Sequence, residues 1–273
     1  MIKTAVLLTV YNRREITLQG LRSLYQAIET LGGDYTFDVY MTDDGSTDGT
    51  AEAVIKEFPD VVVVQGNGDL FWNRGMIKAW EAAIESKLDY DFYLWYNDDT
   101  MLYQSSLSIL FKTYFDCKSS SVIVGAIRAN TDNIVSYGGY VNHIRKSPNG
   151  TAIAIDYMNG NVVLLPKGIV EKVGVLDPFF RHSYGDWEYG YRIRKNNYAL
   201  FLSPSYVGTC DRHDNQEKCY NRNVPLKDRL LYLVSPVGHH PKEVFHYGMK
   251  TEGFFYAVKY TFAVIFKAFF PNL

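Results

Sequence analysis

The sequence lacks several features that mark large classes of proteins. Its 273 residues contain only three cysteines, Cys117, Cys210 and Cys219, an odd number without the spacing of a metal site. This usage fits a reducing compartment, so we expect a cytoplasmic protein. The apolar run at residues 5–10 is too short for a signal peptide. A net charge of −2 gives no basic excess, which argues against nucleic acid as the main partner.

Two glycine-rich nucleotide motifs are also missing. No Gly-x-Gly-x-x-Gly follows the first predicted strand, and no Gly-x-x-x-x-Gly-Lys-Ser/Thr occurs anywhere. The first turn instead carries Tyr11, Asn12, Arg13 and Arg14. We therefore do not expect a pyrophosphate held at a glycine-rich helix start. The alternative is carboxylates that hydrogen-bond the base and ribose, with a metal ion that holds the diphosphate.

Strand and helix patterns alternate over the first hundred residues. Short apolar runs predict strands at residues 4–10, 37–42, 61–65 and 92–96. The apolar face of the first helix is formed by Leu18, Leu21, Leu24, Tyr25, Ile28 and Leu31. Further helices are expected at about residues 51–58 and 73–87. This order predicts an α/β fold with a doubly wound, mostly parallel sheet flanked by helices.

The most informative segment is Asn97-Asp98-Asp99, which closes the apolar run at residues 92–96. Such a run predicts a strand buried on both faces. Adjacent carboxylates repel each other unless a positive charge lies beside them, and a divalent cation is the simplest candidate. The alternative is an Asn-Asp turn that caps the next helix. Polar residues also end the first two strands, so three polar loops are expected to converge at one sheet edge.

Six segments resemble the motifs of family 2 glycosyltransferases, which have the GT-A fold. Leu-Thr-Val-Tyr-Asn at 8–12, Asp-Asp-Gly-Ser-Thr-Asp at 43–48 and Asn-Asp-Asp at 97–99 resemble the three amino-terminal motifs. Residues 159–166 are similar to the segment before the acceptor site. Residues 173–180 resemble a Gly-x-Phe/Leu-Asp-x-x-Phe stretch, and residues 185–192 resemble a Glu-Asp-x-Asp-x-x-x-Arg signature. The resemblance covers about residues 4–215.

The resemblance implies an inverting glycosyltransferase. It would move a sugar from a nucleotide-diphosphate donor to a hydroxyl of a saccharide or lipid-linked acceptor, with Mg²⁺ or Mn²⁺ as cofactor. The expected catalytic base is Asp186. The expected nucleotide-binding residues are Tyr11, Asn12, Asp43, Asp44 and Asp98. The residues expected at the donor and acceptor sugars are Trp72, Asn159, Gly160 and Trp187. The expected metal ligands are Asp99 and His213.

The chain departs from the family pattern at three positions. The metal motif reads Asn-Asp-Asp rather than Asp-x-Asp, so only Asp99 matches the metal-ligating position. Gly185 stands where the family often has Glu, and Glu188 where it often has Asp. This leaves Asp186 as the carboxylate that matches the base. Residues 66–75 resemble bacterial members that build surface polysaccharides, some of which transfer rhamnose.

The chemistry gives an independent reason for these groups. Glycosyl transfer has an oxocarbenium-like transition state, so the leaving diphosphate needs a neutralising charge and the acceptor hydroxyl needs a proton acceptor. Asp186 opens a helix expected at residues 187–196, where its alternative role is an N-cap. Glu188 is expected to form a surface ion pair with Arg192. The alternative for His213 is a solvated loop side chain.

The carboxyl-terminal part differs from the rest. We expect a catalytic domain at residues 1–215 and a helical extension at residues 216–273. Residues 253–270 are aromatic and apolar, with only Lys259 and Lys267 charged. They predict a helix at the membrane interface with snorkelling lysines, on the inner face of the membrane. The alternative is a terminal helix packed on the domain or on another subunit.

Two other functions remain open at this point. A sugar nucleotidyltransferase shares the sheet architecture but needs a glycine-rich, arginine-bearing loop after the first strand, and residues 11–13 offer none. A non-catalytic nucleotide- or carbohydrate-binding domain would not require both Asp99 and Asp186.

Overall fold

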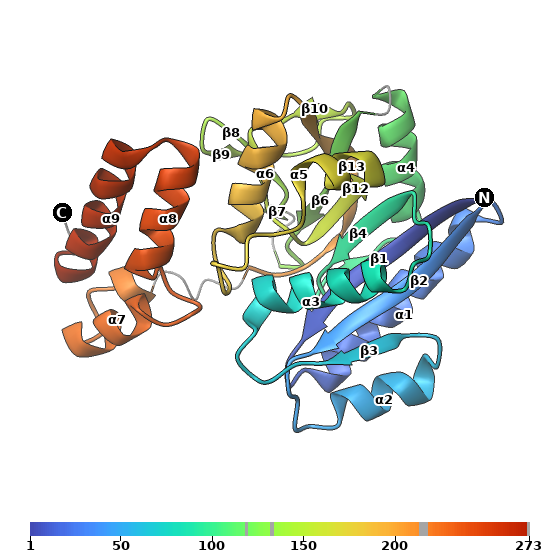
Figure 1. Ribbon diagram of the computed structural model, residues 1–273, viewed down its shortest axis with the longest axis horizontal. Coiled ribbons are helices and arrows are strands. Elements are labelled where there is room, and N and C mark those ends of the chain that lie inside the picture. Colours follow the sequence, from blue (N-terminus) through green and yellow to red (C-terminus); the bar gives the residue numbers. More distant parts are fainter. Residues whose placement is uncertain (118–119, 132–133, 213–217, 272–273) are drawn as a thin grey trace.

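The computed structural model of the protein describes residues 1–117, 120–131, 134–212 and 218–271. A mixed sheet with helices on both faces forms the body of the molecule, and three carboxyl-terminal helices lie together at the end farthest from the amino terminus (Figure 1). The predicted boundary between residues 215 and 216 falls in the stretch outside the described residues.

The amino-terminal half of the sheet is parallel, as predicted. Its strands, in spatial order, are β3 (Val62–Gln65), β2 (Tyr35–Asp43), β1 (Ile2–Val10) and β4 (Phe92–Tyr96). The helices between them are α1 (Arg14–Leu31), α2 (Thr50–Glu57) and α3 (Phe71–Glu85). Helix α3 begins two residues before its predicted start. Parallel strands place their carboxyl ends at one edge, so the polar loops after β1, β2 and β4 lie close together.

The second half of the sheet is mixed. Strand β12 (Val162–Pro166) runs antiparallel between β4 and β6 (Ser121–Arg128), and β13 (Ala199–Thr209) pairs parallel with β6. The short additions to this sheet are β5 (Met101–Leu102), β7 (Val135–Tyr137) and β10 (Ile153–Ala154). A small separate sheet contains β8 (Gly139–Val141), β9 (Ile144–Arg145) and β11 (Tyr157–Met158). The helices are α4 (Ser106–Asp116), α5 (Lys167–Val173) and α6 (Gly185–Lys195).

Alternate residues of the central strands enter two cores. In β4, Tyr93 and Trp95 pack with α3, α5 and α6, whereas Phe92, Leu94 and Tyr96 pack with α1, α2 and α4. All five are buried, which confirms the prediction of a strand covered on both faces. The sheet is thus fixed by helices on each side, and its strand ends form a rigid edge.

The carboxyl-terminal helices are α7 (Leu226–Leu233), α8 (Pro241–Thr251) and α9 (Phe254–Phe269), and they share a third core with Phe180 and Tyr184. None of the described helices is long and apolar enough to cross a lipid bilayer. Ion pairs join α8 to the sheet domain. Lys250 Nζ lies 2.6 Å from Asp177 Oδ2 and 3.0 Å from Glu188 Oε1.

The expected surface ion pair of Glu188 is therefore a buried one. Glu188 is 1% exposed and pairs with Arg192 at 2.9 Å, but α8 packs against this part of α6 and adds Lys250. The surface assignment was wrong because the sequence spacing of α6 does not reveal a second helix packed on it.

Candidate active site

A cleft of about 820 Å³ lies at the edge where β1, β2 and β4 end. Residues after these strands, among them Tyr11, Asp44 and Asp99, form one side. The start of α6 with Asp186 and Trp187, the small sheet, and the segment that leads from Lys218 to His239 supply further walls. Strand-end loops, the α6 start and the carboxyl-terminal helices thus meet in one cavity.

The two carboxylates after β4 share an arginine. Arg13 Nη1 donates to Asp98 Oδ1 at 2.8 Å and to Asp99 Oδ2 at 3.1 Å. Asp98 is 2% exposed, and its other oxygen accepts from Thr17 Oγ1 at 2.7 Å. Burial alone would lower the pKa of Arg13, but the two carboxylates outweigh burial and raise this pKa above its ordinary value. The guanidinium is therefore charged. The positive charge that the sequence required beside these carboxylates is, within the described residues, Arg13.

A thiol holds the other side of Asp99. Cys210 Sγ lies 3.6 Å from Asp99 Oδ1, and burial together with the negative charge of Asp99 raises the pKa of this thiol. Cys210 therefore stays protonated and donates to Asp99. From sequence, Arg13 was considered only as a possible phosphate contact and Cys210 was given no role, because each reaches Asp99 from a distant part of the chain.

Asp99 fits a metal ion that is shared with a substrate. Both carboxylates line the cleft, but Asp99 is the more exposed, with its side chain at 13% against 2% for Asp98. The described residues contain no cluster of three or more metal-binding side chains. Mg²⁺ is commonly bound by one or two carboxylates and completed by phosphate oxygens and water, which this donor set allows. The second predicted ligand, His213, lies outside the described residues.

Asp44 organises the loop before α3. Its Oδ1 accepts from the amide of Gly68 at 2.9 Å, and its Oδ2 accepts from the amides of Leu70 at 2.9 Å and Phe71 at 3.0 Å. These bonds satisfy amides at the start of the helix, which explains why α3 begins at Phe71. Asp44 also lines the cleft, and a carboxylate with three donors keeps about one acceptor position for a ligand.

The loops after β1 and β2 are tied to each other. Asn12 has a φ of 49°. Its backbone amide donates to Ser46 Oγ at 2.9 Å, and its side-chain Oδ1 accepts from the backbone amide of Thr47 at 2.7 Å. Asp43 Oδ1 accepts from the amide of Ser46 at 2.8 Å. Tyr11 beside them is 54% exposed and lines the cleft. Asn12 and Asp43 thus shape the loop, and Tyr11 presents an open ring.

Asp186 lies in the first turn of α6, with its carboxylate held by two amides. Oδ2 accepts from Gly160 at 3.0 Å and Oδ1 from Trp187 at 2.9 Å. Burial raises the pKa of Asp186 to about 6, although these amides oppose the shift. The N-cap alternative was wrong, since α6 begins at Gly185 and the cap position belongs to Tyr184. A carboxylate with a pKa near neutrality is suited to accept a proton.

The departure at Gly185 has a steric cause. A Cβ at this position would lie 1.8 Å from Asn73 Oδ1, so a side chain fits only if the Asn73 side chain moves away. Gly160 is similarly confined, because a Cβ there would lie 2.5 Å from the Trp72 ring. The same Cβ position would lie 3.5 Å from Asp186 Cβ, so the absence of a side chain at residue 160 lets both Trp72 and Asp186 approach it.

Aromatic rings form the walls around these residues. Trp72 donates its indole N–H to Asn97 Oδ1 at 2.8 Å, which links α3 to the end of β4. Trp187 lies 5.1 Å from Tyr157 and 6.1 Å from Tyr140, measured between ring centroids. Asn159 stands beside Asp186, and its hydrogen bond counters the rise in the pKa of Asp186. Four residues predicted to contact sugars, Trp72, Asn159, Gly160 and Trp187, thus line the same cleft as Asp186.

Three cations that sequence reasoning missed also line the cleft. Arg145 lies over the Tyr140 ring at 5.2 Å, Lys218 lies over the Tyr232 ring at 5.8 Å, and Arg212 donates to the Val135 carbonyl at 2.8 Å. They come from separate segments of the chain, so no local pattern groups them. They give this part of the cleft a positive character that suits an anionic ligand.

The sequence pattern of the family described as "Glycosyl transferase family 2" matches residues 5–175, well over half of the chain. The chain belongs to glycosyl transferase family 2. It is therefore a glycosyltransferase, and the match contains all three strand-end loops of the cleft. Asp186 and α6 lie beyond the matched residues. No curated protein matches the chain by sequence.

Solved glycosyltransferase structures share the fold. S. aureus TarS 1–349 in complex with UDP-GlcNAc has a TM-score of 0.61 and 12% identity, over 92% of this chain and 66% of that one. The mannosyltransferase PcManGT from Pyrobaculum calidifontis in complex with GDP-Man and Mn²⁺ has a TM-score of 0.56 and 15% identity, over 97% of this chain and 74% of that one. At these identities the likeness concerns the fold, which confirms the predicted GT-A architecture.

Proposed function

We propose that this family 2 glycosyltransferase transfers a sugar from a nucleotide-diphosphate donor to a hydroxyl of a saccharide or lipid-linked acceptor, with inversion of the anomeric configuration. The nucleotide lies at the ends of β1, β2 and β4, with its base against Tyr11 and its ribose near the free acceptor positions of Asp43, Asp44 or Asp98. The nucleotide-sugar complexes of TarS and PcManGT support this class of donor.

A Mg²⁺ or Mn²⁺ ion would be held by Asp99 and His213 together with the donor diphosphate. Such an ion neutralises charge on the departing diphosphate. Arg13 and Cys210 keep the Asp99 carboxylate oriented toward the cleft from its two sides. The Mn²⁺ in the PcManGT complex supports a metal in an enzyme of this fold.

Asp186 accepts the proton of the attacking hydroxyl, and its position is the observation that carries the proposal. It is a cleft carboxylate held by two amides, with a pKa raised to about 6, and both it and Trp72 approach residue 160. One carboxylate base in this position deprotonates an acceptor that attacks from the side opposite the diphosphate. That single displacement inverts the configuration.

Trp72, Asn159, Gly160 and Trp187 hold the sugars on either side of the bond that forms. The rings of Trp72 and Trp187 offer apolar faces for pyranose rings, and the Asn159 amide keeps Asp186 in place. The resemblance of residues 66–75 to bacterial polysaccharide enzymes supports a cytoplasmic role in building cell-envelope glycans.

The first test is to find the donor and then the product configuration. A thermal-shift screen of UDP-, GDP- and dTDP-sugars with and without Mn²⁺ should identify one donor, because a ligand at a hundred times its dissociation constant adds about 2.7 kcal/mol of stability. NMR of the product formed from that donor should show inversion. A retained configuration, or full turnover in a chelator, would contradict the proposal.

A further inference from the structure

Helix α9 turns an aromatic face outward. Phe255 is 88% exposed and Phe262 is 67% exposed, and Val258, Phe266 and Phe269 are exposed with them. Their spacing of three and four residues places all five on one side of the helix. A helix on the surface of a soluble domain normally presents charged and polar residues there, so this face is suited to contact something apolar.

The inward face of α9 packs on the third core. Ala257, Val264 and Ala268 are the buried positions of the helix, and Tyr260 packs against the same core. Ala257 packs so closely on α8 that a Cβ at Gly248 would lie 2.5 Å from its Cα. The helix is thus packed on its own domain through one face, while Phe255 and Phe262 remain outside. Packing on the domain, the alternative considered from sequence, accounts for one face only.

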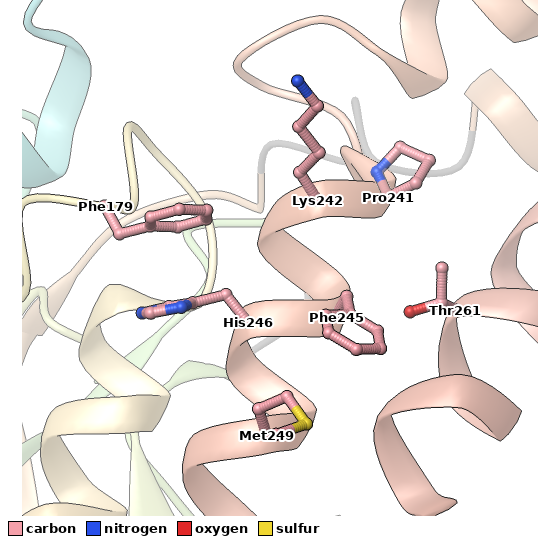
Figure 2. A pocket seen from close by; sticks show the side chains of 7 residues that line it. All are labelled: Phe179, Pro241, Lys242, Phe245, His246, Met249 and Thr261. Atoms are coloured by element: carbon pink, nitrogen blue, oxygen red, sulfur yellow. The ribbon is translucent and has the colours of Figure 1, made fainter. Parts of the chain in front are cut away.

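An apolar groove of about 430 Å³ adjoins this face. It is lined by residues of the 174–180 loop, α8 and α9 (Figure 2), namely Phe179, Pro241, Lys242, Phe245, His246, Met249 and Thr261. The Phe245 ring lies 6.4 Å from the ring of Phe254, the first residue of α9. The groove therefore continues the apolar surface from α9 onto α8, with the Lys242 ammonium at its margin.

The charges near this surface favour an anionic partner. Residues 241–271 hold four lysines and two glutamates, which gives +2 on a chain whose total is −2. Glu243 is paired with Arg181 at 3.0 Å and Lys250 with Asp177 at 2.6 Å, so three lysines and one glutamate remain and the balance is still +2. Helix α9 itself carries Lys259 and Lys267 and no acidic residue. If two copies paired through the middle of α9, their Lys259 ammonium groups would meet without a carboxylate from either helix, which disfavours a second copy.

We propose that α9 and the adjoining groove dock the protein on the surface of an anionic lipid bilayer. The phenylalanine side chains enter the acyl boundary, and Lys259 and Lys242 contact the anionic headgroups. The segment between α7 and α8 contributes Val237 and His239 to the active cleft, so the wall of the cleft leads directly into α8, which carries the docking groove. A docked enzyme would therefore hold its cleft near acceptors anchored in that membrane.

Vesicle sedimentation of the full chain tests this proposal. Vesicles of phosphatidylcholine with about a quarter phosphatidylglycerol should sediment the wild-type protein, and pure phosphatidylcholine should bind it more weakly. Phe255→Glu/Phe262→Glu should weaken binding at least a hundredfold, because each buried phenylalanine contributes about a tenfold factor or more. Lys259→Gln should weaken it about fivefold on anionic vesicles only.

The matched control is Ile55→Glu/Ile84→Glu, at positions 52% and 48% exposed on α2 and α3. This variant should bind like the wild type, and each variant is checked by circular dichroism and by melting in the presence of the donor. If Phe255→Glu/Phe262→Glu fails to fold, Phe255→Ser replaces it at the most exposed position. Absence of wild-type binding to anionic vesicles overturns the proposal. So does a dimer that only the α9 variant disrupts while no form binds vesicles.

Discussion

The carboxylates at the two sides of the cleft are held in different ways. On the strand-end side, Asp44 accepts hydrogen bonds from three amides. Asp98 on the same side accepts from Arg13 and Thr17. On the α6 side, Asp186 has two amide partners and a pKa raised to about 6. Burial raises the pKa of Asp98 as well, but there Arg13 and Thr17 oppose the shift. The difference teaches that the strand-end carboxylates are engaged by loops and by a cation, whereas Asp186 is held by amides, as the proposed base requires.

The largest expected effect is a loss of turnover that leaves donor affinity nearly unchanged. Asp186→Asn should lower turnover by about 10² to 10⁴, because general-base assistance has that magnitude. Donor affinity, measured by calorimetry, should change little, since Asn keeps the size of the side chain and one acceptor oxygen. The comparison would break if this variant turned over like the wild type.

Removing the arginine should affect folding first. Arg13→Met leaves Asp98 buried without its cation, which should cost about 3 kcal/mol in urea unfolding. Arg14→Met is the matched control, because the Arg14 side chain is 52% exposed and its ion pair among the described residues, with Glu15 at 3.7 Å, lies at the surface. It should stay within about 0.5 kcal/mol of the wild type. Equal stability of the two variants would show that Arg13 does not hold the two carboxylates.

Asp44→Ala should destabilise the loop before α3. Three amides lose their acceptor, with an expected cost of about 2 kcal/mol in unfolding free energy, and hydrogen exchange at Gly68, Leu70 and Phe71 should speed up. Asp69→Ala in the same loop alters an exposed carboxylate and serves as the control. If Asp44→Ala abolished donor binding without faster exchange, Asp44 would be a ligand contact rather than a loop anchor.

The smallest expected effect concerns Asp177, whose pKa is lowered, whereas the pKa of Asp186 is raised. Burial raises the pKa of Asp177, but hydrogen bonds from Lys250 and His246 outweigh it and lower the value to about 2. Stability from this group is present above about pH 4 and is lost as pH falls through about 2, in total about 2 kcal/mol. Between pH 5 and pH 3, the free energy of unfolding measured in urea should fall by about half of this total. Asp177→Asn should remove this pH dependence. The same pH dependence in Asp177→Asn would exclude this cause.

Much of the fold follows from local sequence. The apolar runs predicted β1, β2, β3 and β4 to within two residues at each end. In β4 the reason is burial on both faces, which needs continuous apolar side chains, whereas β3 lies at the sheet edge and is only partly buried. The start of α3 was missed because its amides are satisfied by Asp44, a residue from another strand end. The antiparallel direction of β12 was also missed, because a buried strand has the same composition whichever way it runs.

The candidate site, like the fold, was predictable from the sequence only in part. Motif order identified the segments that form the cleft, and Asp99 and Asp186 lie in it as expected. Which carboxylates are fixed by the protein's own groups was not visible, because Arg13, Thr17 and the 68–71 amides approach from other elements. Arg145, Arg212 and Lys218 were missed because their surroundings arise only from the folded arrangement.

The most direct test of Asp186 as the base is the pH dependence of kcat/KM. The raised pKa predicts that kcat/KM rises with pH through a midpoint of about 6 and levels off above it, since the base acts only when ionised. The residual activity of Asp186→Asn should lack this limb. A wild-type profile that is flat between about pH 5 and pH 8, or a limb that persists in Asp186→Asn, would contradict the account.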